Sequence, residues 1–175
     1  MKYLLLGICS FFMLNFSFAE QSFLKMSNNR GFVVAEFPCQ PNSRSASSST
    51  TNVTSLQCLV GDESNFCTFL LSDSDLDMAE FNKNDMRWIQ AIHDQYAKSL
   101  GLYKTTKLDF KTTKLGKSLE YEIYAKNSGR DLQVNGTWTV YGDRLLRIAT
   151  ICYPIGNNPV SRQKQSFLNS MGIVK

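Results

Sequence analysis

The chain of 175 residues lacks a complete catalytic or cofactor motif and contains only one histidine, His93. The nucleophile motif G-x-S-x-G does not occur, and catalysis by a histidine-activated nucleophile would need a serine or cysteine beside His93. No C-x-x-C pair occurs either, which disfavours a structural zinc site built on paired cysteines. We therefore predict a protein without enzymatic activity and without a cofactor.

Charged residues are also few, at 19% of the chain, whereas hydrophobic residues make up 43%. This balance is that of a globular protein and excludes a disordered chain. A chain of this length normally forms one compact core, so we expect one domain over residues 20–175.

Long apolar runs are absent apart from Tyr3–Phe18 at the N-terminus. This run is interrupted by polar residues, is shorter than the ~20 residues of a membrane-spanning helix, and lacks a basic flank after it. It follows Lys2 and ends in the small-residue pattern Ser17-Phe18-Ala19. The sequence therefore predicts a signal peptide over residues 1–19, no transmembrane segment after its removal, and export to the periplasm or, by type II secretion, to the exterior.

Four cysteines remain once the predicted signal peptide is removed: Cys39, Cys58, Cys67 and Cys152. An even number in an oxidising compartment predicts two disulfides, with three possible pairings. If 51–60 and 64–71 form a hairpin with a four-residue loop, Cys58 lies opposite Cys67. That geometry favours a Cys58–Cys67 bond and leaves Cys39 for Cys152.

Charge is distributed unevenly along the chain. Residues 20–82 contain 3 basic and 8 acidic side chains, whereas residues 83–175 contain 15 basic and 7 acidic ones. The net charge of the mature chain is small, so we expect no nucleic-acid partner.

The pattern of apolar and turn residues predicts the remaining structure. A strand is expected over 31–37, a surface loop over 42–51, and an amphipathic helix from an Asn84 cap to Gly101. Four strands joined by short turns are expected over 104–113, 117–126, 132–141 and 144–153, and a last helix over 159–170. This order predicts an α+β fold in which two helices pack on an antiparallel sheet of about seven strands.

The order of these segments resembles the Mog1/PsbP-like group of small α+β proteins. The resemblance is carried by the strand and turn Phe32–Pro41, the hairpin, the amphipathic helix, the long meander and the closing segment Ser166–Ser170. It departs from the group at Cys39 and in the serine-rich loop. The resemblance implies a small exported bacterial member of the group with a binding or adaptor role and no shared catalytic site.

The most unusual local feature is a run of five lysines within fourteen residues: Lys104, Lys107, Lys111, Lys114 and Lys117. Strict strand alternation puts Lys107 and Lys111 on one face and Lys104 and Lys114 nearer the other. Such a strip could bind phosphates, anionic lipid headgroups or acidic glycans. The alternative is an edge strand whose lysines prevent aggregation.

An acidic segment provides a weak calcium candidate in Asp73, Asp75 and Asp77. Alternating carboxylates can bind calcium, but the EF-hand glycine and glutamate positions hold other residues. The alternative is a solvated segment whose charges oppose the N-terminus of the following helix.

The remaining candidate residues have ordinary structural explanations. His93 is expected at the boundary of the helix's apolar stripe, and Trp88 in the core. Glu120 and Glu122 share a strand face and could form a carboxylate pair of glycosidase type. Trp138 fits either the core or an exposed aromatic platform.

Together these features predict a secreted or periplasmic binding module that engages an anionic surface or partner, such as a lipid headgroup, glycan or acidic protein, through the lysine strip. Two alternatives stay open. One is a small hydrolase whose site forms only in the folded protein, and the other is an accessory subunit of a cell-envelope assembly, which would expose an apolar patch.

Overall fold

The computed structural model describes residues 23–27, 32–47, 52–75, 86–156 and 163–174. The predicted signal peptide, the Asn84 cap and the start of the predicted last helix lie outside these residues. The described elements are β1 Leu24–Ser27, β2 Val33–Phe37, β3 Asn42–Ser47, β4 Asn52–Gly61, β5 Phe66–Asp75, α1 Arg87–Ser99, β6 Leu102–Thr113, β7 Gly116–Asn127, β8 Arg130–Tyr141, β9 Arg144–Tyr153, α2 Lys164–Asn169 and β10 Gly172–Ile173.

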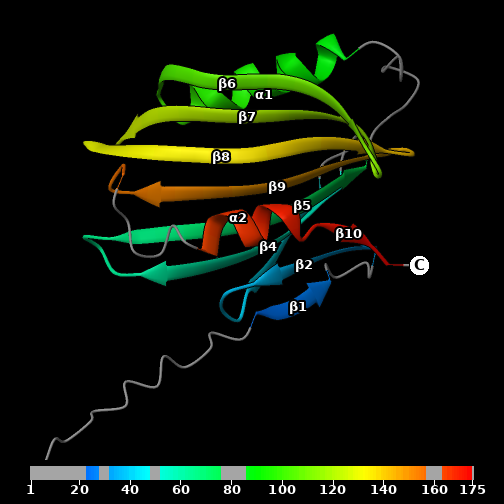
Figure 1. Cartoon of the computed structure of the whole chain (residues 1–175), viewed down its shortest axis with the longest axis horizontal. Helices are drawn as coiled ribbons and strands as arrows, with labels where there is room; N and C mark the ends of the chain where they lie inside the picture. Colours follow the sequence, from blue (N-terminus) through cyan, green and yellow to red (C-terminus); the bar gives the residue numbers. More distant parts are fainter. Residues whose placement is uncertain (1–22, 28–31, 48–51, 76–85, 157–162, 175) are drawn as a thin grey trace, which may run out of the picture.

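The described strands form two antiparallel sheets (Figure 1). The larger sheet has seven strands in the order β3-β4-β5-β9-β8-β7-β6, and the smaller has three in the order β1-β2-β10. The predicted meander of four strands is confirmed, since β6, β7, β8 and β9 pair in sequence. The two helices are short, with 13 residues in α1 and 6 in α2.

The predicted α+β class is therefore wrong, because the fold is mostly β. Part of the error lies in the predicted loop over 42–51. Its residues 42–47 form β3, which pairs along its whole length with β4 while every side chain stays exposed. Serines have low strand propensity, but an edge strand gains its ladder hydrogen bonds from the neighbouring strand whatever its side chains are. The short strands β1 and β10 were also not predicted.

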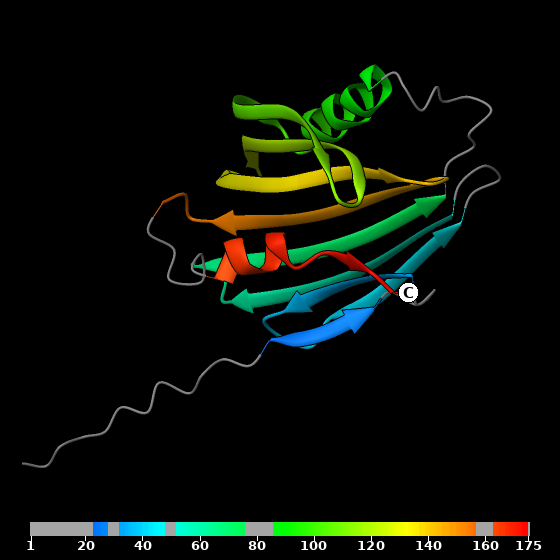
Figure 2. The ribbon, with the colours of Figure 1, turned by 45° about the vertical axis from the view of Figure 1, so that its right-hand side comes forward.

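The large sheet has an apolar core on each face because its side chains alternate between the two faces. On one face, Leu146 and Ile148 pack with Phe37 of β2 and Phe167 of α2. On the other face, Leu145 and its neighbours pack with Ile89 and the rest of the apolar stripe of α1. Figures 1 and 2 show α1 and α2 on opposite sides of the sheet.

Two disulfides are present, as predicted, but the favoured pairing is wrong. Cys39 bonds to Cys58, and Cys67 bonds to Cys152, with Cα atoms 5.9 Å and 4.1 Å apart. The reason is the hairpin register, in which Val60 rather than Cys58 lies opposite Cys67. Cys152 faces Cys67 from the other side, on β9. The two bonds indicate an oxidising compartment, and therefore export from the cytosol.

We predict that peptide mapping of the unreduced protein will recover the Cys39–Cys58 and Cys67–Cys152 cross-links. Replacing Cys67 and Cys152 together by alanine should lower the free energy of unfolding by about 4 kcal/mol, because this bond closes the longer loop. Replacing Cys39 and Cys58 should cost about 3 kcal/mol. Urea denaturation measures both, and recovery of a Cys58–Cys67 peptide would contradict the pairing.

Candidate functional site

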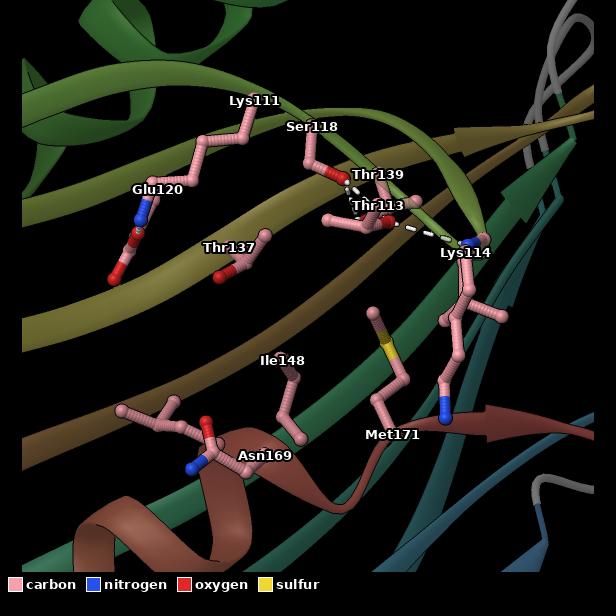
Figure 3. Close-up of a pocket in the computed structure, with 12 residues that line it drawn as sticks. Lys111, Thr113, Lys114, Ser118, Glu120, Thr137, Thr139, Ile148, Asn169 and Met171 are labelled. Atoms are coloured by element: carbon pink, nitrogen blue, oxygen red, sulfur yellow. Dashed lines mark hydrogen bonds and ion pairs between the residues drawn. The ribbon is translucent and has the colours of Figure 1, made fainter.

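A polar cleft lies between α2 and strands β6–β8, on the sheet face opposite α1 (Figure 3). We call it the α2 cleft. It comprises a cavity of about 300 Å³ and a smaller one of about 160 Å³, which share Glu120, Thr137, Leu168 and Asn169.

The cleft is polar because alternation along β7 and β8 turns their polar residues towards α2. The apolar partners Leu119, Tyr121 and Ile123 point to the α1 side instead. The polar side chains on the cleft face are Ser118, Glu120 and Glu122 of β7 and Gln133, Asn135, Thr137 and Thr139 of β8.

The lysine strip is divided between the two faces, but not as strict alternation predicts. An irregularity between Thr105 and Lys107 shifts the register, so that Lys104 pairs with Tyr124 and Lys107 pairs with Glu122. Tyr124 and Glu122 lie on the cleft face of β7, and directly paired side chains share a face. The bulge therefore brings Lys104, Lys107 and Lys111 to one face.

The other two lysines of the strip lie at different places. Lys114 is in the turn between β6 and β7 and lines the larger cavity, whereas Lys117 lines a separate hollow with Met86 and Phe110 on the α1 side. Figure 3 shows Lys111 reaching towards Glu120 and Lys114 extending at the other end of the cavity, near Met171. Three of the five predicted lysines, Lys107, Lys111 and Lys114, therefore line the cleft, and Lys104 lies on the same face of the sheet outside it.

Two of these lysines share one carboxylate. Lys107 Nζ donates to Glu120 Oε1 at 2.6 Å, and Lys111 Nζ donates to Glu120 Oε2. Burial alone would raise the pKa of Glu120, but the hydrogen bonds from Lys107 and Lys111 outweigh it and lower the pKa. The same hydrogen bond raises the pKa of Lys107. Glu120 and Lys107 therefore both carry their charges at neutral pH.

A second network joins α2 to the sheet. Lys164 Nζ of α2 donates to Gln133 Oε1 at 3.3 Å and to Asn135 Oδ1 at 3.0 Å. Gln133 Nε2 in turn donates to Glu122 Oε1 at 2.6 Å. Burial lowers the pKa of Lys164, against the opposing effect of the Glu122 charge. The amide oxygens hold an ammonium group that is half-buried at the wall of the cleft.

The predicted carboxylate pair lies in the cleft but is not set up for acid catalysis. Burial would raise the pKa of Glu122, yet hydrogen bonds from Gln133 and Tyr124 lower it. Because Glu120 also has a lowered pKa, neither carboxyl group retains a proton at neutral pH, as a general acid must. The pair is better suited to positioning lysines than to transferring protons.

His93 is a buried residue of α1, on the face of the sheet opposite the cleft. It is 2% exposed, which is deeper than the predicted boundary position, and its ring packs on Tyr121 with centroids 4.6 Å apart. Burial lowers the pKa of His93, and the charge of Arg147 adds to this effect while Asp94 opposes it. His93 is therefore a structural residue of the α1 core.

We predict that the protein loses stability as the pH falls below about 6.5, the ordinary pKa of histidine. Below that pH, His93 is protonated in the unfolded chain, but burial disfavours its protonation in the folded chain. Proton binding therefore lowers the free energy of unfolding. Urea midpoints at pH 7.5 and 5.5 should differ for the native protein and should nearly coincide for His93→Phe. Glu120, Glu122 and Asp62 titrate below this window, because the pKa of each is lowered. An unchanged pH dependence in the variant would contradict the assignment.

The α1 core also contains a residue that the sequence analysis missed. Arg147 is 6% exposed, donates from Nε to the Tyr121 hydroxyl at 3.0 Å, and lies over the rings of Tyr96 and Trp138. Trp138 is thus a core residue rather than an exposed platform, and Trp88 packs partly buried on the same core. Nothing in the strand pattern distinguishes a buried arginine from an exposed one, because its position depends on the stacked aromatic rings.

The predicted calcium ligands are engaged by an arginine. Asp73 Oδ2 accepts a hydrogen bond from Arg144 Nη1 at 2.6 Å, and Asp75 lies 3.7 Å from the same atom. Asp77 lies outside the described residues. No cluster of metal-ligating side chains occurs among the residues that the structure describes. The guanidinium group thus supplies the positive charge that a cation would provide there.

We predict that Asp73→Asn lowers the free energy of unfolding by about 3 kcal/mol, because Asp73 is fully buried and the change leaves the Arg144 charge without its main partner. Asp75→Asn is the matched control and should cost less than about 1 kcal/mol, because Asp75 is 39% exposed. Thermal unfolding with and without calcium completes the test. A rise in Tm on adding calcium would contradict the arginine assignment.

Comparisons with known proteins leave the family open. No family model matches the chain, and no curated protein matches it. Among solved structures, the chain is similar to "Protein of Unknown Function PA94 from Pseudomonas aeruginosa, Putative Regulator", with 13% identity and a TM-score of 0.48 over 81% of this chain and 89% of that one. The resemblance to the Mog1/PsbP-like group stays a prediction.

The described residues contain no helix long and apolar enough to cross a membrane.

Proposed function

We propose that the protein is a non-enzymatic binding protein of the periplasm or the cell exterior, and that it holds an anionic group of its ligand in the α2 cleft. The observation that carries the proposal is the surplus of positive charge in the α2 cleft, where Lys107, Lys111, Lys114 and Lys164 outnumber Glu120 and Glu122. Lys107 and Lys111 share the single carboxylate of Glu120, and Lys114 has no acidic partner among the described residues.

The larger cavity is also lined by hydroxyl groups beside Lys111 and Lys114. The hydroxyl groups of Ser118 and Thr139 are 2.9 Å apart, and that of Thr113 lies 3.4 Å from Ser118. Thr113 and Ser118 also donate to the Gly116 carbonyl, so these groups bond mainly to one another and to the turn. A carboxylate or phosphate group entering here would gain charge-assisted hydrogen bonds from the ammonium groups.

This proposal differs in one respect from a flat basic surface that binds anionic lipids or glycans through all five lysines. Lys117 lies on the opposite side of the sheet, so the strip does not act as one surface. The envelope-subunit alternative has less support, because the large exposed apolar side chains are spread over β1, β4, β6 and the C-terminal segments. A ligand that enters a cleft fits the geometry better than one that covers the sheet edge.

The experiment is calorimetric titration of the oxidised protein with glycerol phosphate and with citrate, at low and at high salt. We expect salt-sensitive binding that is weakened about tenfold by Lys114→Gln and similarly by Lys111→Gln, because each change removes a charged hydrogen bond. Lys117→Gln is the matched control, since it removes a lysine of the same strip from the other face. Equal losses in all three variants, or no binding of either anion, would overturn the proposal.

A further inference from the structure

A third cavity, which we call the β10 cavity, continues the α2 cleft at the end where β10 lies. Its volume is about 450 Å³, and it is lined by Lys114, Leu115, Tyr141, Gly172 and Ile173. Lys114 and Leu115 also line the larger cavity of the α2 cleft. The two spaces therefore meet at the turn between β6 and β7, and each has the size of a small-molecule site.

The walls of this extended cleft change from charged to apolar in the same direction. On one wall, β6 contributes Lys107 and Lys111 and then leads into Leu115 of the turn. On the other wall, α2 begins at Lys164 and leads through Met171 to Ile173 of β10. Both walls thus present ammonium groups at one end and aliphatic side chains at the other.

The apolar end is continuous with the interior of the protein. Leu115, Tyr141 and Ile173 all pack against the core that α2 and the small sheet share with the large sheet. None of the side chains that line the β10 cavity is acidic, and its one charged group is Lys114 at the junction. An alkyl chain placed here would contact Leu115, Tyr141 and Ile173 and would be shielded from water by them.

We infer that the ligand is a single-chain anionic amphiphile, an alkyl carboxylate or alkyl phosphate. The inference rests on the proposed function and names its ligand class. The acidic head lies between Lys111 and Lys114, which both line the larger cavity. The alkyl chain passes Leu115 and fills the space between Tyr141 and Ile173. Lys114 lines both cavities, so its ammonium group lies within reach of the head at the point where the chain begins.

Chain length gives this assignment a quantitative signature. Each methylene group transferred from water into the cavity should tighten binding about fourfold until the cavity is full. A site that recognises only the anionic head gives no such gain.

The test is calorimetric titration of the oxidised full-length mature protein with alkyl carboxylates and alkyl phosphates of increasing length, below their critical micelle concentrations. Glycerol phosphate serves as the probe for the head alone, and an alkyl maltoside as the probe for a chain without charge. We expect affinity to rise with chain length and then level off, and the maltoside to bind at least tenfold more weakly than the anion of equal length. The two series also show whether carboxylate or phosphate is preferred.

The variant Leu115→Gln replaces a partly buried aliphatic side chain of the turn by a polar one of similar size and so makes the junction polar. It should reduce the gain per methylene and leave glycerol phosphate binding unchanged. Leu59→Gln is the control, because Leu59 is 60% exposed on β4 and lies outside the cleft. Thermal unfolding of each variant verifies that it folds, and if Leu115→Gln does not fold, the chain-length series on the native protein decides by itself.

The outcomes separate the two proposals. If glycerol phosphate binds and longer chains add nothing, the amphiphile inference fails while the proposed function stands. If no anion of any length binds, both fail. If the maltoside binds as tightly as the anions, the site is apolar only and the role of Lys111 and Lys114 is wrong.

Discussion

The join between β5 and β9 is the contact on which the rest of the molecule depends. The strands β3, β4 and β5 come from the first half of the chain, and β6, β7, β8 and β9 come from the second half. They become one sheet only where β5 pairs with β9, and the Cys67–Cys152 bond ties this pair covalently. The helix α2 spans the same join. Phe167 anchors α2 on Phe37 and Phe69 from the first half, while the cleft's polar wall comes from β7 and β8.

Because of this pairing, the uneven distribution of charge along the sequence becomes an uneven distribution of charge across the sheet. The acidic part of the sequence forms the strands β3, β4 and β5 at one edge of the sheet, and the basic part forms the strands β6 to β9 at the other edge. Within the basic half, Glu120 accepts hydrogen bonds from Lys107 and Lys111 and holds both ammonium groups in place. The site is therefore neither a uniformly positive surface nor a neutral one, and it differs from the rest of the basic half in its hydroxyl and amide groups.

Much of this architecture follows from local patterns, whereas the site depends on register. Alternation and turn residues locate β6 to β9 correctly, and the even number of cysteines correctly indicates two disulfides. The alternation of Ser118, Glu120 and Glu122 with apolar neighbours already marks a polar face. The sequence does not reveal the bulge at Thr106, which turns Lys104 to the face of Lys107, or the hairpin register that separates Cys58 from Cys67. Each depends on hydrogen bonds between strands, and a shift in strand pairing leaves the local composition unchanged. The sequence also does not predict the hydrogen bonds from Lys164 of α2 to β8, because they join segments that are distant in the chain.

The order of the cysteines constrains how the exported chain matures. A chain that crosses a membrane from its N-terminus presents Cys39 and Cys58 first, and these are native partners only 19 residues apart. Cys67 follows, but its partner lies 85 residues further on. An early Cys39–Cys58 bond removes both cysteines with which Cys67 could form a shorter, non-native loop. Cys152 is then the remaining native partner of Cys67, so the bond that ties β5 to β9 forms on a chain whose local loop is already closed.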